Sequence, residues 1–416
     1  MIADESAAGG VSWPRRVLVA HNYYRSASPS GEDAVFDGEC RLLERAGINV
    51  TRYFRHNDAL DDHGLSGRLR AGMDAVWSPS ARREILALIE RDSPDVVHFH
   101  NTFPQISPSA YRGARLGNRP VVQTLHNYRL VCPGALLLRE GRPCEDCIGG
   151  GRVSGLRHAL RHRCYRDSRA ATAAVVTMLA THRISGTYAT GVDRYIALTR
   201  FAASKLAAGG LPSDRLVVKP NFVDGPPVAG TGRGGYAVYV GRLSREKGVE
   251  TMLAAWERVR GVQLKVIGDG PLDEELRRYA RDRGIDVEFA GRQPRGEVLR
   301  VVADAALQVV PSECYEGFPM VIAEAYACGT PVVASAIGSL DELVEDGVTG
   351  ARFRAGDASD LASTVMRLSN SPAELALLRA GARDRYERNY TPAANLRQLI
   401  DVYRQAAMVA SARVGR

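Results

Sequence analysis

Two glutamates in the segment 312–325, Glu316 and Glu324, have a type and spacing that could do chemistry in this 416-residue chain. Gly317 and Pro319 lie between them and predict a turn from a strand into a helix, because proline at a first helical position loses no hydrogen bond. A helical rise of about 1.5 Å per residue would place the carboxylates roughly 12 Å apart. A glycosidase pair needs about 5–9.5 Å. The spacing fits hydroxyl groups at the two ends of a nucleotide-sugar, although a helix-entry glutamate and a surface glutamate would share it.

Arg242 and Lys247 form a candidate phosphate site in the segment 241–248, which follows a predicted strand and opens a helix. A guanidinium and an ammonium beside backbone N–H groups suit a diphosphate. Both could also be solvated loop charges, but only four lysines stand among the 55 basic residues, at positions 205, 219, 247 and 265. Gly268 and Gly270 follow the next strand and allow close approach of a base or ribose, or form an ordinary turn.

Histidines end two predicted strands of the first half of the chain. His98 and His100 share one face of their strand because side chains alternate along it, and Asn101 follows. His126 and Asn127 end the next strand. These groups could hydrogen-bond sugar hydroxyls, or they could only hold loop carbonyl groups.

Four of the seven cysteines fall between positions 132 and 164. Cys144 and Cys147 have the spacing of a zinc knuckle, and Cys132 and Cys164 could complete a four-thiolate site. Such a zinc ion would be structural, since four thiolates leave no open coordination position. Free thiols or a disulfide are the alternatives.

The hydrophobic pattern alternates strands with helices along the whole chain, which predicts an α/β fold of parallel sheets. The segment 224–235 has five glycines and two prolines, a linker composition, and divides the pattern into two series. We therefore expect two tandem doubly wound, Rossmann-like domains with the active site in the cleft between them. The expected strands are 16–20, 48–53, 96–100, 120–124, 236–240, 263–267, 287–289, 307–310 and 331–334.

The second series carries a set of motifs in a consistent order, densest between residues 215 and 365. They are Asn221, Gly241-Arg242, Glu246-Lys247-Gly248, Gly268-x-Gly270, the pair Glu316 and Glu324, the segment 327–335, and the segment 346–350. With these motifs the chain resembles the retaining GT-B glycosyltransferases of the E-x7-E type, which are similar to glycosyltransferase family 4. Two departures are Gly338-Ser339, where the family often has two glycines, and the first loop, which keeps only Gly31 of a common glycine pair.

The resemblance implies a role for each motif. Arg242 and Lys247 would hold the donor diphosphate, Glu316 the sugar hydroxyls and Glu324 the ribose. His126 would lie near the donor sugar, which makes His126, Arg242, Lys247 and Glu316 the expected catalytic residues. Further donor contacts are expected from Gly31, Asn221, Gly241, Gly268, Gly270, Gly317, Phe318, Pro319, Met320 and Val321. His100, Asn101 and Asn127 are the candidates on the acceptor side.

The resemblance also implies the domain boundaries. Residues 1–222 would form the acceptor domain, with the cysteine-containing insertion at 128–170. Residues 223–392 would bind the donor, and the helix within 393–416 would pack back on the first domain.

The implied reaction moves a sugar from a nucleotide-diphosphate-sugar to a hydroxyl acceptor with retention, by front-face attack. Arg242 and Lys247 would supply positive charge where other folds use a metal, so no metal cofactor is expected. A sugar-nucleotide epimerase of GT-B architecture is the alternative enzyme. A non-catalytic binding module is the alternative outside enzymes, but it would need neither paired carboxylates nor a diphosphate site.

The formal charge of +8 raises the question of anionic partners. No nucleic-acid-binding motif accompanies it, so we expect no nucleic-acid partner. The segment 152–169 has six arginines and one acid, which predicts a solvated helix or a weak peripheral contact with an anionic membrane. Acidic residues at positions 4 and 5 argue against a signal peptide, and the apolar run 170–180 is too short to span a membrane. We expect a cytoplasmic protein with reduced thiols.

Overall fold

The computed structural model describes residues 13–26, 30–60, 64–149, 151, 153–225 and 230–414. Residues 28 and 29 of the first loop, part of the glycine-rich linker, Arg152 and the acidic start of the chain lie outside these ranges.

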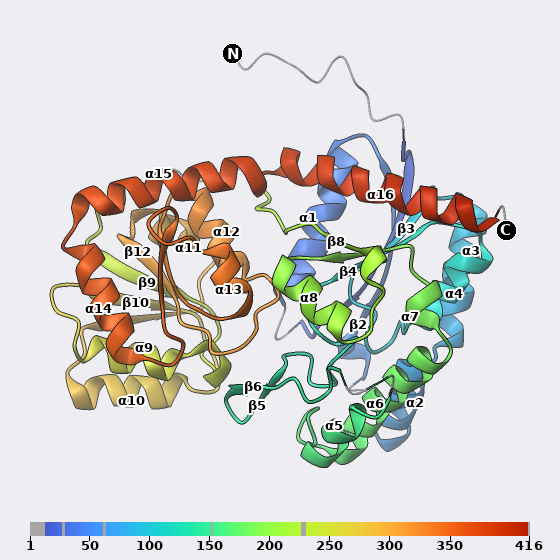
Figure 1. Cartoon of the computed structure of the whole chain (residues 1–416), viewed down its shortest axis with the longest axis horizontal. Helices are drawn as coiled ribbons and strands as arrows, with labels where there is room; N and C mark the ends of the chain where they lie inside the picture. The colour runs from blue at the N-terminus through green and yellow to red at the C-terminus, as the bar shows by residue number, and fades with distance from the viewer. Residues whose placement is uncertain are drawn as a thin grey trace.

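The described residues form two six-stranded parallel sheets, one in each half of the chain, as the α/β pattern predicts (Figure 1). The first sheet has the order β2-β1-β3-β4-β7-β8. Its strands are β1 (Arg16–Tyr23), β2 (Asn49–His56), β3 (Val96–Phe99), β4 (Val121–Leu125), β7 (Arg194–Ala197) and β8 (Leu216–Val218). The helices of this domain include α1 (Gly31–Arg45), α3 (Pro79–Asp92), α4 (Ser109–Leu116), α7 (Thr187–Thr190) and α8 (Arg200–Ala208).

The second sheet has the order β11-β10-β9-β12-β13-β14. Its strands are β9 (Tyr236–Val240), β10 (Gln263–Ile267), β11 (Val287–Gly291), β12 (Leu307–Val310), β13 (Val332–Ser335) and β14 (Gly350–Phe353). The helices are α9 (Val249–Trp256), α10 (Asp273–Arg283), α11 (Arg295–Asp304), α12 (Met320–Ala327), α13 (Gly338–Leu343) and α14 (Ala358–Ser369). The inner strands β1 of the first sheet and β9 of the second mark the point where the strand order reverses, which is where doubly wound sheets bind ligands.

The central strands are short apolar runs because both faces of each sheet are covered by helices. The four residues Val17–Ala20 of β1 are fully buried, and so are the four residues of β12 and of β13. Helix α1 starts at Gly31, where Ser30 and Asp33 form a capping box.

Two long helices join the domains. Helix α15 (Pro372–Asn389) runs along the second domain, and α16 (Pro392–Val414) continues across the first (Figure 1). The hydroxyl group of Tyr403 on α16 lies 3.0 Å from Nδ1 of His98 on β3. The C-terminal helix is therefore packed directly on the first sheet.

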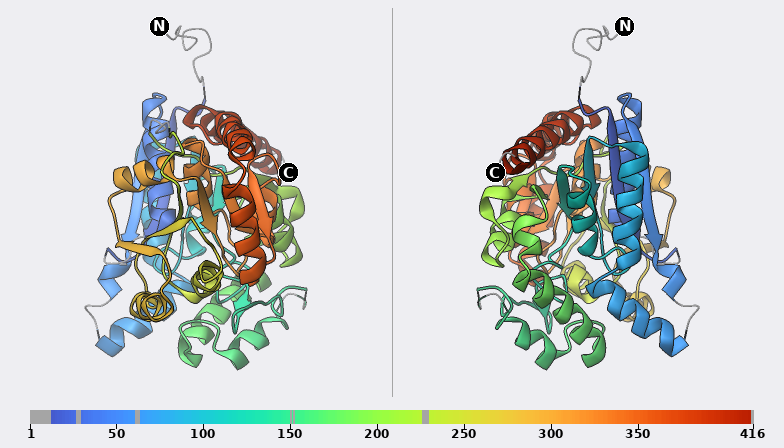
Figure 2. Two further views of the ribbon diagram at one scale, coloured as in Figure 1. Left: turned by 90° about the vertical axis from the view of Figure 1, so that its left-hand side faces the viewer. Right: turned by 90° about the vertical axis from the view of Figure 1, so that its right-hand side faces the viewer.

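The segment that contains the four clustered cysteines leaves the first domain at one end (Figure 2). It holds the short strands β5 (Leu138–Arg139) and β6 (Arg142–Pro143) and helix α5 (Leu156–His162). Helix α6 (Arg169–Ile184) follows and packs between α5 and α2 (Gly64–Val76). No described helix is both long and apolar enough to cross a membrane.

Candidate functional site

The loops after β9 and β12 bring Lys247 and Glu316 together at the carboxyl edge of the second sheet. Lys247 Nζ donates to Glu316 Oε1 at 2.6 Å, and the hydroxyl group of Ser312 donates to the same oxygen at 2.7 Å. The two side chains are 30% and 13% exposed, so the pair is sheltered but open to solvent. A cation and a carboxylate of this kind can receive a phosphate and a hydroxyl group.

The pKa values of the pair are shifted in the directions that keep both groups charged. Burial opposes ionisation of Glu316, but the Lys247 ammonium and the hydrogen bonds from Lys247 and Ser312 outweigh it and lower the pKa of this carboxyl below its ordinary value. Burial likewise opposes the charge on Lys247, and Glu316 outweighs it, so the pKa of Lys247 is raised.

Arg242 stands in the same loop with an exposed side chain. Its backbone carbonyl accepts a hydrogen bond from the Tyr239 hydroxyl at 2.8 Å, which fixes the loop at the end of β9. Because the guanidinium is not engaged by a carboxylate among the described residues, it is available to a diphosphate.

The glycines of this edge let two loops pack against each other. Gly268 has φ +142°, and a Cβ there would collide with the carbonyl group of Gly241. A Cβ at Gly270 would collide with Leu243. Close backbone packing therefore requires these glycines, whether or not a ligand approaches them.

Glu324 lies apart from the Lys247–Glu316 pair and bonds a different cation. Its Oε1 accepts from Nε of Arg295 at 3.0 Å, and Arg295 also donates to the Asp224 carbonyl in the linker. Burial raises the pKa of Glu324, with Arg295 opposing the shift. Glu316 lies in the loop before α12, which begins at Met320, and Glu324 lies on the helix, so the predicted turn between them is present and the spacing of about 12 Å remains a prediction.

Gly317 and His126 lie where the two domains meet. A Cβ on Gly317 would collide with the backbone carbonyl of His126, so only glycine allows this approach. The hydroxyl group of Tyr128 donates to the Glu316 carbonyl at 3.3 Å across the same junction. The loop with Glu316 therefore rests directly on the strand end of the first domain.

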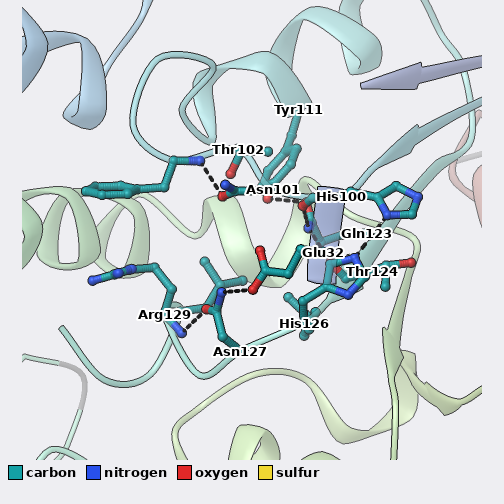
Figure 3. A pocket seen from close by; sticks show the side chains of 13 residues that line it. Glu32, His100, Asn101, Thr102, Tyr111, Gln123, Thr124, His126, Asn127 and Arg129 are labelled. Atoms are coloured by element: carbon teal, nitrogen blue, oxygen red, sulfur yellow. Dashed lines mark hydrogen bonds between the residues drawn. The ribbon is translucent and has the colours of Figure 1, made fainter. Parts of the chain in front are cut away.

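A pocket in the first domain opens beside this junction (Figure 3). His100 Nδ1 lies 3.0 Å from His126 Nε2, and Asn127 donates to Glu32 Oε1 at 2.8 Å. The expected acceptor-side residues His100, Asn101 and Asn127 all line the pocket. Its other lining residues are Glu32, Thr102, Phe103, Tyr111, Gln123, Thr124, Leu125, His126, Arg129 and Leu130.

Glu32 is a charged pocket residue that was not predicted from the sequence. Its Oε2 is buried and has no hydrogen-bond partner in the described part of the chain, and burial raises the pKa of the carboxyl. An unsatisfied buried oxygen favours a ligand hydroxyl group as its partner. Glu32 could have been predicted from its position next to Gly31, in the first loop, which resembles the glycine-rich loop of the family.

Several expected donor residues have structural roles in the described chain. The Phe318 ring packs on Tyr390 with ring centroids 5.6 Å apart, and Pro319 occupies the residue just before α12. Asn221 is buried, Met320 and Val321 are half-buried, and a Cβ at Gly31 would meet nothing within 4 Å. Their donor contacts remain predictions.

The four clustered cysteines are all free thiols. Burial is the main cause that raises the pKa of Cys147 to about 12, with Cys132, Cys164 and Cys144 adding to it. The four residues are therefore neighbours, and a structural zinc ion on them remains a prediction from the spacing.

The fold is a two-domain GT-B architecture, in which the loop that carries Glu316 meets the strand end that carries His126. Two family profiles match the chain. "Glycosyltransferase Family 4" matches residues 35–225, and "Glycosyl transferases group 1" matches residues 234–371. The matches cover most of both domains, so the chain belongs to the glycosyltransferases that these families describe.

Curated relatives match part of the chain. Glycogen synthase of Mycobacterium tuberculosis is 37% identical over 154 residues, which are 36% of this chain and 37% of the relative. D-inositol 3-phosphate glycosyltransferase of Mycolicibacterium smegmatis is 34% identical over 201 residues, 46% of this chain and 41% of the relative. The matches thus span well under two thirds of these relatives' length.

Solved structures share the fold over nearly the whole chain. Sucrose-phosphate synthase from Thermosynechococcus elongatus has a TM-score of 0.67 at 20% identity and covers 94% of this chain and 99% of its own. Anabaena HepE in complex with UDP and glucose has a TM-score of 0.65 at 17% identity, and the match covers 93% of this chain and 99% of HepE.

Proposed function

We propose that this protein transfers a sugar from a nucleotide-diphosphate-sugar to a hydroxyl acceptor with retention of configuration. The observation that carries the proposal is the Lys247–Glu316 pair beside the free guanidinium of Arg242, placed against the His126 strand end. The curated relatives, which are named as glycosyltransferases, and the UDP complex of HepE support the same donor class.

In this proposal Arg242 and Lys247 bind the donor diphosphate, and Glu316 binds hydroxyl groups of the donor sugar. Lys247 would exchange part of its bond to Glu316 for a phosphate oxygen, which leaves the carboxylate free for a hydroxyl group. Glu324 binds the ribose, in place of part of its contact with Arg295. The acceptor enters from the pocket of Glu32, Asn101 and Asn127.

The acceptor hydroxyl attacks the anomeric carbon on the face that the diphosphate leaves. The bond to the acceptor oxygen forms as the bond to the diphosphate oxygen breaks, and the leaving oxygen takes the acceptor proton. Arg242 and Lys247 stabilise the negative charge on the departing diphosphate, so the reaction needs no divalent metal. The protein's contribution is charge placement and orientation.

A thermal-shift comparison of UDP, GDP, ADP and dTDP tests the donor site. We expect one diphosphate to raise the melting temperature by several degrees without a metal. Absence of a shift with all four would contradict the proposal. The control is Arg242→Ala, in which the shift should shrink because the exposed guanidinium adds nothing to the unliganded fold.

We further propose that the acceptor is presented at an anionic surface, which the basic helix α5 contacts. Arg157, Leu160 and Arg161 are exposed on this helix. Cosedimentation with phosphatidylglycerol vesicles should exceed that with phosphatidylcholine vesicles and should fall with salt. Equal cosedimentation with the two kinds of vesicle would contradict the membrane contact and indicate that α5 is a solvated helix.

A further inference from the structure

Glu39 is a buried carboxylate in the first domain that none of the roles above explains. It lies on α1, is 1% exposed, and faces β3 from behind the pocket. Lys219 Nζ lies 3.2 Å from its Oε2. Its Oε1 lies 3.2 Å from His98 Nδ1 and 3.3 Å from His100 Nε2. Burying a charged group costs desolvation free energy, so a buried carboxylate with these polar neighbours calls for an explanation.

Lys219 keeps this carboxylate ionised. Burial opposes the charge on Glu39, but the Lys219 ammonium and the hydrogen bonds from His100 and His98 outweigh it, and the pKa of the carboxyl lies well below its ordinary value. Lys219 itself is 2% exposed and is one of only four lysines in the chain. An ionised carboxylate accepts hydrogen bonds and donates none.

A metal site is the competing explanation. Glu39, His98 and His100 are the group of potential ligands, among the described residues, whose atoms lie within 4.8 Å of one another. The Lys219 ammonium already balances the single negative charge, and a divalent ion would stand beside it. Like charges repel strongly in a buried site, so the cluster is better explained as a hydrogen-bond network.

The network fixes which ring nitrogens carry protons. His100 Nε2 and Glu39 Oε1 are both buried and lie 3.3 Å apart, and neither has a hydrogen bond of ordinary geometry to a described group. Because the ionised carboxylate can only accept, this contact is favourable when His100 Nε2 carries a proton. His100 must then be protonated at Nε2, and its Nδ1 becomes an acceptor. The nitrogen that faces this Nδ1 at 3.0 Å is Nε2 of His126. His126 must therefore donate from Nε2.

We infer that Glu39, paired with Lys219, is a positioning residue that sets the tautomer of His126 through His100, so that Nδ1 of His126 is a free hydrogen-bond acceptor. His126 lines the pocket and its backbone touches the Gly317 loop. An acceptor nitrogen there suits a sugar hydroxyl group, which donates one hydrogen bond. Only the binding of a sugar hydroxyl group to this nitrogen rests on the proposed function.

The tautomer can be read from the nitrogen chemical shifts of histidine in the wild-type protein labelled with 15N-histidine. His126→Gln identifies the resonances of His126. We expect a protonated Nε2 and an unprotonated Nδ1 at pH 7.5. A protonated Nδ1 in the wild type would overturn the inference, whatever the variants do.

Glu39→Gln tests the cause. Lys219 needs an acceptor, so the new amide should turn its oxygen toward Lys219 and its NH₂ group toward the histidines. His100 Nε2 would become an acceptor, its Nδ1 would donate to His126 Nε2, and the proton of His126 would move to Nδ1. Where Glu39→Gln does not fold, Lys219→Met should give the same change, because the unpaired carboxyl would hold a proton and donate it to His100. An unchanged His126 tautomer in the folded variant would overturn the inference.

Asp193→Asn is the matched control. Asp193 is also a buried carboxylate, paired with Arg115 at 3.0 Å and Arg413 at 2.8 Å. It precedes β7 and so lies at the amino edge of the sheet, whereas His126 follows β4 at the carboxyl edge. The Asp193→Asn substitution should leave the nitrogen chemical shifts of His126 unchanged.

Once a substrate is identified, Glu39→Gln should lower kcat about tenfold and leave the Kd for nucleoside diphosphate unchanged. If the tautomer changes as expected but the wild type turns over no nucleotide-sugar, the proposed function fails and the network stands.

Discussion

Lys247 Nζ lies 2.6 Å from Glu316 Oε1, although 69 residues separate the two in the sequence. The contact exists because β9 and β12 are neighbours in the second sheet, and the loops that follow them meet at its carboxyl edge. This relationship places a cation and a carboxylate in one sheltered position.

Lys247→Met should reduce turnover of the nucleotide-sugar by roughly 10²–10³-fold, because the departing diphosphate loses a preorganised positive charge. The Kd for the acceptor should change little. Lys265→Met is a matched control, since Lys265 pairs with Glu288 on the neighbouring strand, away from the site. Equal turnover in wild type and Lys247→Met would disprove the diphosphate role.

Turnover should persist in excess chelator, since Arg242 and Lys247 supply the positive charge. The measurement is the release of nucleoside diphosphate with and without EDTA after the protein has been dialysed against it. A complete loss that only magnesium or manganese restores would refute the metal-independent mechanism.

Gly317→Ala should impair turnover more than stability. The added Cβ would collide with the His126 carbonyl, so the loop that carries Glu316 must move away from the first domain. We expect roughly a tenfold or greater loss of kcat/KM, with a cooperative unfolding transition retained. Gly296→Ala, on α11, meets no atom within 4 Å and serves as control. A fully active Gly317→Ala protein would show that the contact is dispensable.

Stability should fall as the pH drops below about 6.5, the ordinary pKa of histidine. Burial, with nearby histidines adding to it, lowers the pKa of His100 to about 3 and that of His126 well below its ordinary value. The unfolded chain therefore takes up protons that the folded protein does not. Each such histidine can lower the free energy of unfolding by up to ~1.4 kcal/mol per pH unit below 6.5 and contributes nothing above it.

Urea unfolding at pH 7, 6 and 5 measures this effect. His100→Asn should show a shallower loss than wild type, because one of the two groups is gone. Parallel curves for the two proteins would argue against a neutral buried His100.

The sequence predicts the strand–helix alternation and the placement of Arg242, Lys247 and Glu316 at strand ends, because buried parallel strands are apolar runs that need no long-range information. It did not predict β7, β8 or β14. Of these, β14, Gly350–Phe353, has no β-branched residue.

Contacts that depend on strand order could also not be predicted from the sequence. Glu39 lies on α1, which follows β1, whereas its partner Lys219 follows β8, and β1 and β8 are not neighbours in the sheet. Glu32 looks like an ordinary acidic residue in the first turn of a helix. Only the packed structure shows that its second oxygen is buried without a partner.

Retaining transfer is tested most directly by following a bound nucleotide-sugar by proton NMR with purified protein in excess chelator. Water serves as the acceptor where no other is known. We expect slow release of nucleoside diphosphate together with free sugar that first appears in the anomeric configuration of the donor. Sugar that first appears with the inverted configuration would contradict retention, and an isomerised nucleotide-sugar without released diphosphate would contradict transfer itself.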